Sequence, residues 1–237
     1  MAGILMIAAG LTGIGYWLYQ QPAIAADAAR NELTAATQTL QPTIGILLSL
    51  DLAVGEANAS QQLVNVNAEA RSLFDIAGTL PNTLSRERSI AADIAGQALE
   101  GSRILNDAYA YRSAVIPILE QPEFETDPSL IALDDAAATF GLWQNRFQGV
   151  AAALPTGIMS ALGDELNLIS GKLDALQTGY LDALRTGDIG DVALVTGELE
   201  TTLEAAEAIL STEFDQMASA ALVEFANAEE SIRLLLG

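Results

Sequence analysis

The sequence predicts an all-α protein: an N-terminal single transmembrane helix followed by an elongated antiparallel bundle of long helices. Hydrophobic residues make up 51% of the 237 residues but aromatic residues only 5%, so the apolar content is mainly Ala, Leu, Ile and Val. Ala, Leu, Glu and Gln have high helix propensity. Apolar residues recur every three to four positions, which is the spacing of one helix face.

The N-terminal stretch Gly3–Tyr19 contains no charged residue. As a helix it would be about 25 Å long, the short end of the range for a membrane span. Two tyrosines and a tryptophan stand at its end, where interfacial aromatic residues belong. We expect residues 1–22 to form a single-pass anchor that stops at Pro22. The alternatives are a signal peptide cleaved near Ala25, which would give a secreted protein, and a buried core helix.

The segment that follows the predicted anchor is poor in basic residues. Arg30 is the only one between positions 20 and 70. Cytoplasmic segments next to a membrane helix are usually rich in Lys and Arg. The sequence therefore favours a cell-membrane protein whose body is extracytoplasmic.

Two helices are expected before position 80. The first, Ala23–Leu40, should break or kink at Pro42, because proline lacks the backbone N–H that a helix interior requires. The second should begin at Thr43 and run to about Ala77. Its apolar stripe has six members (Leu63, Val66, Ala70, Leu73, Phe74 and Ala77). Gly78 should cap it, with a proline three positions later.

A third helix is expected from Asn82 to about Ile116, and it carries four arginines. They are Arg86, Arg88, Arg103 and Arg112. Such side chains commonly form salt bridges with a neighbouring acidic helix. The alternative is an anion-binding site in which Arg103 or Arg112 meets a small ligand, with Tyr109 and Tyr111 nearby.

A proline-rich acidic stretch divides the body. Residues 121–128 are expected to form a loop between two helical halves, 23–120 and 129–237. Asp127 and Pro128 suit the start of a helix that reaches about Ala153. On that helix Phe140, Trp143 and Phe147 share one face, either as core or as an anchor for another protein.

Two further helices are expected, from Ile158 to Arg185 and from about Asp191 to Leu235, with a break at Gly187. The last one repeats apolar residues every 3.6 positions on average, the period of a straight helix. The members are Val192, Val195, Leu199, Leu203, Ala206, Leu210, Phe214, Met217, Ala221, Phe225, Ala228 and Ile232. Between Arg185 and Arg233 the chain has acids and no base, which predicts a solvated acidic face. The alternatives are a docking face for a basic partner and low-affinity binding of divalent cations.

Composition excludes several classes of function. The chain has no Cys and no His, which removes zinc fingers, Fe–S sites and catalysis by a Ser-His-Asp or Cys-His set. A net charge of −21 with no basic cluster disfavours nucleic acid. No nucleotide-binding motif is present, and no cofactor is expected. An enzyme that uses carboxylates stays conceivable, but nothing selects an acid–base pair.

The sequence therefore predicts a non-catalytic accessory or scaffold subunit rather than an enzyme. Its expected partner is another membrane protein or a second copy in a homo-oligomer, with the membrane itself contacted through Gly3–Tyr19. The alternative is an extracytoplasmic sensor-like bundle that binds a small ligand.

Overall fold

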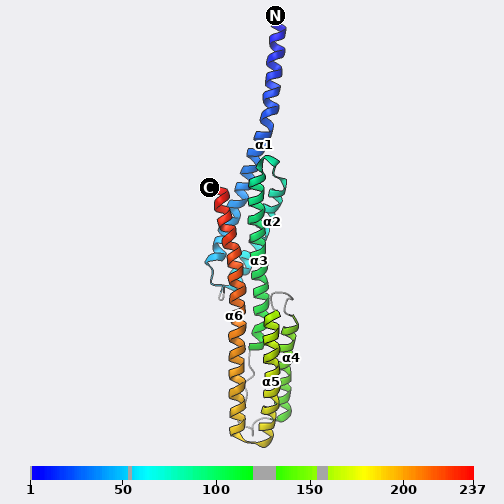
Figure 1. The fold of residues 1–237 in the computed structure, drawn as a ribbon, viewed down its shortest axis with the longest axis vertical. Helices are drawn as coiled ribbons and strands as arrows, with labels where there is room; N and C mark the ends of the chain where they lie inside the picture. The colour runs from blue at the N-terminus through cyan, green and yellow to red at the C-terminus, as the bar shows by residue number, and fades with distance from the viewer. Residues whose placement is uncertain (1, 53–54, 120–131, 154–159) are drawn as a thin grey trace. The chain divides into compact units, whose positions relative to one another are not determined.

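The protein is all-helical in every part of the chain that the structure describes (Figure 1). The computed structural model describes the backbone of residues 2–52, 55–119, 132–153 and 160–237. It describes the side chains of residues 23–52, 55–113, 132–142, 144–145, 149 and 168–237. Within these ranges the helices form a bundle without strands, which confirms the predicted all-α class.

The described residues form six α-helices and one 3₁₀ helix. Their bounds are α1 Ala2–Ser49, α2 Glu56–Thr79, η1 (3₁₀) Asn82–Leu84, α3 Ser85–Leu119, α4 Leu133–Ala153, α5 Ser160–Thr186 and α6 Ile189–Leu236. The final helix extends close to its predicted bounds. All of its predicted core positions are buried except Val195, which is half-buried.

The chain divides into two compact units, and α3 and α6 contribute to both. Unit 1 comprises Met1–Asn106 and Ala218–Gly237, and unit 2 comprises Asp107–Met217. These units are composed differently from the halves 23–120 and 129–237 expected from the sequence. The expected loop at 121–128 lies outside the described residues.

In unit 1, α1 packs along α2, and its helix continues through Pro42. The predicted breaks at Pro22 and Pro42 are therefore wrong. A proline inside a helix costs about 3 kcal/mol relative to alanine. Around Pro42 the burial of Leu40, Ile44 and Leu47, each 0% exposed, offsets that cost.

The first true break lies between α1 and α2. The Gly55 N–H donates to the Asp51 carbonyl at 2.8 Å, and a Cβ at position 55 would lie 2.9 Å from that oxygen. Glycine is the residue that fits this close approach. The single helix predicted from Thr43 to Ala77 is therefore two helices.

The other end of α2 also differs from the prediction. Gly78 lies inside the helix and does not cap it, and the chain leaves the helix at Leu80, whose backbone is extended before Pro81. A residue before proline disfavours helical geometry, which explains this stop. Phe74, expected in the apolar stripe, is 54% exposed, whereas the other five members are buried.

Helices α3 and α6 approach closely in unit 1 at Gly101. A Cβ at this position would lie 3.0 Å from Phe225 Cε1 and 3.1 Å from the Ala221 carbonyl oxygen. Phe225 is fully buried and the carbonyl belongs to a helix backbone, so neither can yield easily. The two helices also share a hydrogen bond from Ser231 to Gln97 at 3.4 Å.

Replacing Gly101 by alanine is expected to destabilise unit 1 despite the better helix propensity of alanine. We expect a net loss of up to about 2 kcal/mol, because overpacking costs about 1–3 kcal/mol and the propensity gain returns about 1 kcal/mol. Urea unfolding monitored by circular dichroism measures the change. Gly45, where an added Cβ would meet nothing within 4 Å, supplies the control, since Gly45→Ala should stabilise. Equal stabilisation by both variants would contradict the close approach.

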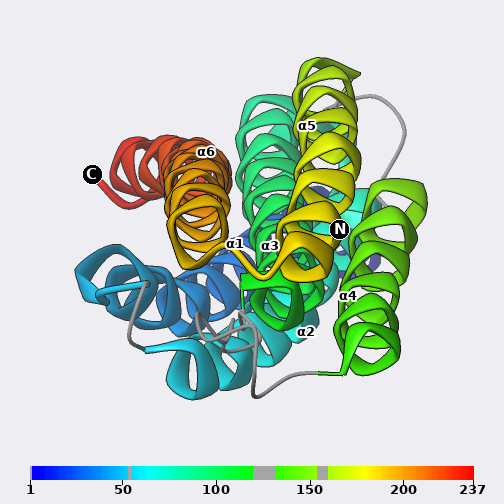
Figure 2. The same ribbon diagram turned by 90° about the horizontal axis from the view of Figure 1, so that it is seen from below.

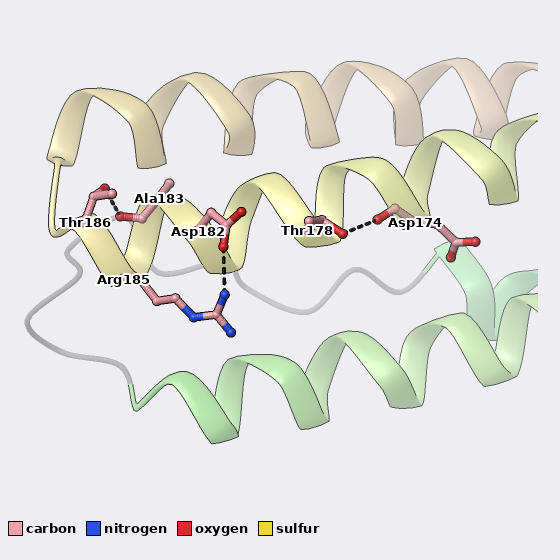
Figure 3. Close-up of polar contacts among 6 residues, drawn as sticks. All are labelled: Asp174, Thr178, Asp182, Ala183, Arg185 and Thr186. Atoms are coloured by element: carbon pink, nitrogen blue, oxygen red, sulfur yellow. Dashed lines mark hydrogen bonds and ion pairs between the residues drawn. The ribbon is translucent and has the colours of Figure 1, made fainter.

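In unit 2, α5 lies between α4 and α6 (Figures 2 and 3). The core includes Phe140 of α4, Tyr180 of α5 and Leu199 of α6. Gly187 ends α5 with a φ of +69°, the left-handed conformation that favours glycine, as its predicted role as a break requires. Asp188 then caps α6, because its carboxylate accepts the Gly190 N–H at 2.8 Å.

The anchor prediction concerns residues whose side chains the structure does not describe. The backbone of Gly3–Tyr19 is helical within α1, and its side chains lie outside the described set. Among the residues that are described, no helix combines the length and apolar character needed to cross a bilayer.

Candidate partner-binding groove

An open groove lies between α5 and α6 in unit 2, with a cavity volume of about 610 Å³. Both helices contribute to its lining. The α5 residues are Lys172, Ala175 and Leu176, and the α6 residues are Ala193, Leu194, Gly197, Glu198, Thr201 and Thr202. It is thus a surface formed by one helical hairpin.

Small side chains on both helices leave the groove unfilled. At Gly179 the two helices are close, since an added Cβ would lie 3.7 Å from Val195 Cγ2. Along the groove, Ala175 on α5 and Ala193 and Gly197 on α6 have too little side-chain volume to fill the space. A Cβ at position 197 would meet nothing within 4 Å.

The groove is mostly apolar although it faces solvent. Leu194 is 64% exposed, and Ala175 and Ala193 are exposed as well. These residues lie away from the core face of α6, which buries Val192 and Leu199. The hairpin thus presents two apolar faces, one of which packs against nothing among the described residues.

The α5 wall of the groove contains Lys172, the only lysine of the chain. Lys172 forms no ion pair with any described residue. In contrast, Arg185 of the same helix pairs with Asp182 at 2.7 Å, and the Arg185 side chain extends away from α6 (Figure 3). Figure 3 also shows the bond from Thr178 to the Asp174 carbonyl, which keeps that hydroxyl on its own helix.

The α6 wall of the groove is acidic. Glu198 lines it, and helical spacing places Asp191 and Glu204 along its edges. All three are exposed, and none has an ion-pair partner among the described residues. From Ile189 to Glu230, α6 carries no basic residue.

The residues proposed for an anion site fall in different units. Arg103 belongs to unit 1, where it pairs with Glu100 of its own helix at 2.6 Å; this hydrogen bond lowers the pKa of Glu100. Tyr109 and Arg112 belong to unit 2, and both contact Phe214. The Tyr109 and Phe214 ring centroids are 5.9 Å apart, and the Arg112 guanidinium carbon lies 5.2 Å from the Phe214 centroid.

The remaining predicted arginines have different environments. Arg88 donates to the Leu80 carbonyl and to Asn82 at 3.4 Å, so it ties the start of α3 to the end of α2. Arg86 forms no ion pair with a described residue. A salt bridge between two helices comes from Arg30 of α1, which meets Glu87 of α3 at 3.5 Å.

Tyr111, next to the proposed anion-site residues, is a structural group of unit 2. Its hydroxyl donates to the Leu210 carbonyl at 3.3 Å, and the side chain is 3% exposed. Burial, aided by the Glu213 carboxylate, raises the pKa of the Tyr111 phenol well above its usual value of 10.0.

Tyr111 is expected to make the fold sensitive to high pH. Above pH 10 the unfolded chain releases this proton while the folded chain keeps it, so stability should fall by about 1.4 kcal/mol per pH unit from this group. Tyr111→Phe should remove this part of the decline, and at pH 7 it should cost about 1 kcal/mol for the lost hydrogen bond. Urea unfolding at pH 7 and at about pH 11 compares the two proteins. An equally steep decline in the variant would contradict the assignment.

The aromatic face proposed for partner binding is described only at Phe140. That residue is 1% exposed, and its ring centroid lies 6.2 Å from that of Tyr180, so it belongs to the core of unit 2. The side chains of Trp143 and Phe147 lie outside the described residues.

Sequence reasoning missed the groove because it followed the apolar stripes that form the core. The available signal was weaker: Ala193, Gly197 and Thr201 recur every four residues on the side of the final helix away from that stripe. Among the described residues, no group of three or more acidic side chains is placed to hold a metal ion. Comparison with protein-family models, curated proteins and solved structures found no match to this chain.

Proposed function

We propose that this protein is a non-catalytic accessory or scaffold subunit that binds another protein through its helical body. Gly3–Tyr19 tethers it to the cell membrane as a single-pass anchor, and the body is extracytoplasmic. One observation carries the proposal: the groove between α5 and α6 is apolar, open to solvent and lined by small side chains.

The openness of the groove favours a macromolecular partner over a small ligand. Small-molecule sites usually bury most of the ligand surface inside a concave pocket. A molecule on the exposed residues Ala193, Leu194 and Gly197 would keep much of its own surface in water. A protein surface covers such a patch completely and removes the apolar area from solvent.

The composition supports a role without chemistry. The chain lacks His and Cys, and its only lysine stands alone on α5. Carboxylates are abundant, but acid–base catalysis needs two groups held at a defined separation with different pKa values. The ionisable side chains of the groove, Lys172 and Glu198, are both exposed.

The proposal is tested by gentle solubilisation of C-terminally tagged protein from its own membranes, followed by native mass measurement. Co-migration with another protein at fixed stoichiometry is the expected result. Recovery as a monomer would contradict the accessory role. Recovery in the soluble fraction with an N-terminus near Ala26 would contradict the anchor. Deleting residues 1–22 should release the body from the membrane while its helix content is retained.

A second candidate is a sensor-like bundle that binds a small anionic ligand, and it is favoured by Lys172, which forms no ion pair with the side chains that the structure describes. The groove volume of about 610 Å³ falls in the range of small-ligand sites. A monomeric protein that loses affinity for a bound anion after Lys172→Ala would support this alternative. If a site at Tyr109 and Arg112 of unit 2 binds the anion, Arg112→Ala should have that effect instead.

A further inference from the structure

We infer that the groove between α5 and α6 binds one helix of the partner, about three turns long, with a small apolar contact face and a basic edge that lies along α6. This inference rests on the proposed function and specifies the chemistry of the partner. It is carried by the shape of the groove, the size of its side chains and the distribution of its charges.

The shape of the groove favours a helix. Its α6 wall extends from Ala193 to Thr202, about 14 Å along the helix axis, which corresponds to about three turns. Two parallel ridges with a trough between them are the surface into which a third helix packs. The absence of side-chain volume at Gly197 allows that helix to approach closely.

The distribution of charge in the groove indicates which side of the partner helix carries the basic residues. Asp191, Glu198 and Glu204 lie in or beside the groove on α6, and no basic residue of α6 precedes Arg233. Lys172 lies on the opposite wall. A helix with basic residues on its α6 side would be attracted by the three carboxylates, and without basic residues on its α5 side it would not be repelled by Lys172. An acidic helix would be repelled by the three carboxylates.

A second copy of this chain fits the groove less well. The chain carries a net charge of −21, and two such molecules repel each other. In a symmetric dimer through this groove, α6 would present its own carboxylates to those of its copy. A basic partner removes this repulsion and gains long-range attraction instead.

Designed peptides test the inference with the full chain in mild detergent. The probe is a fluorescein-labelled 21-residue helical peptide with an Ala/Leu contact face and lysine along one edge; its counterpart has glutamate at the same positions. Fluorescence anisotropy should show saturable binding of the basic peptide, weakening as NaCl is raised, and little binding of the acidic one. No binding of the basic peptide, or equal binding of both, would overturn the inference.

A groove-filling variant links the binding to this place. Gly197→Trp fills the trough, and its backbone position tolerates a side chain because nothing lies within 4 Å of an added Cβ. We expect at least about tenfold weaker binding of the basic peptide. Gly45→Trp, at an equally open and exposed helical glycine in unit 1, is the matched control and should bind normally. Unchanged binding by Gly197→Trp would overturn the inference. If Gly197→Trp does not fold, Ala193→Trp is the groove-filling variant for the same measurement.

A charge-matched pair of variants separates local from global electrostatics. Removing the three carboxylates of the α6 wall (Asp191→Asn, Glu198→Gln and Glu204→Gln) should weaken binding about tenfold. Removing three exposed carboxylates of unit 1 (Glu32→Gln, Asp75→Asn and Asp93→Asn) changes net charge equally and should have a much smaller effect. Equal effects would show non-specific attraction and overturn the inferred basic edge.

The native complex distinguishes this inference from the proposed function. If Gly197→Trp disrupts the co-purified complex, both are supported. If the complex persists with Gly197→Trp, the accessory role stands and the groove is not the binding surface. If no complex exists for the unaltered protein, the proposed function itself fails.

Discussion

Replacing Phe225 by alanine should destabilise unit 1 by about 3–5 kcal/mol, the usual cost of deleting a large buried aromatic side chain. Phe225 is fully buried in α6, and its ring edge lies where α3 carries Gly101. The ring fills the space that the glycine leaves, so its removal creates a cavity between two rigid helix backbones. Such backbones relax little, which places the cost at the upper part of this range.

Hydrogen exchange in combination with urea unfolding tests the Phe225→Ala result. Amide hydrogen exchange should accelerate in those parts of α3 and α6 that belong to unit 1. Val223, two residues away and 57% exposed, is the control, and Val223→Ala should change stability by less than about 0.5 kcal/mol. In the Phe225→Ala background, Gly101→Ala should cost less than it does alone, because the ring it would contact is gone. Additive losses would contradict the direct contact.

Replacing Pro42 by alanine should stabilise unit 1 by up to about 3 kcal/mol. Pro42 lies inside α1, is exposed, and cannot donate a hydrogen bond to the carbonyl of Gln38. Alanine restores this bond and removes the clash between the proline ring and that carbonyl. The buried neighbours Leu40 and Ile44 keep their places, so the gain is not offset by lost packing.

Thermal and urea unfolding measure the Pro42→Ala effect. Gln41→Ala, one position earlier on the same helix, changes helix propensity only slightly and should shift stability by less than about 0.5 kcal/mol. A loss of stability in Pro42→Ala would mean that α1 needs a bend at this position to pack against α2. Exchange rates near Ile44 would then rise in the variant.

Periodicity predicted the helices well where one face is continuously buried. The final helix is the clearest case: its stripe from Val192 to Ile232 follows the observed burial, because one apolar face is covered along its whole length. Gly187 was also recognised correctly, since a positive φ is a local property that the residue type itself reports.

Tertiary packing explains where the sequence predictions failed. Pro42 and Gly78 are breakers by local propensity, but packing of α1 on α2 outweighs the cost of retaining each inside a helix. The break at Gly55 depends on a close approach to the Asp51 carbonyl, which composition does not reveal. Helical spacing places Phe74 next to the apolar stripe, but the residue lies beyond the edge of the buried face and is exposed.

The groove is harder to predict than the core because it is defined by the absence of large side chains between two helices. Ala193 and Gly197 look like ordinary helix residues until the neighbouring helix is placed beside them. Conversely, Phe140 has the residue type of an interface anchor but is buried against Tyr180. Residue type identifies a side chain that can bind, and only the packing decides whether it is available.

One unit is a single stretch of the chain and the other combines two separate stretches, and this difference affects the order in which they can fold during synthesis. Unit 2 is one continuous stretch, Asp107–Met217, so its core can close as soon as α6 has left the ribosome as far as that point. Unit 1 combines α1 and α2 with the last stretch of α6, including Phe225 and Ile232. The core of unit 1 can therefore be completed only after this last stretch of α6 has been synthesised. Until then Gly101 of α3 lacks the Phe225 ring that packs against it, so we expect unit 1 to complete its core after unit 2.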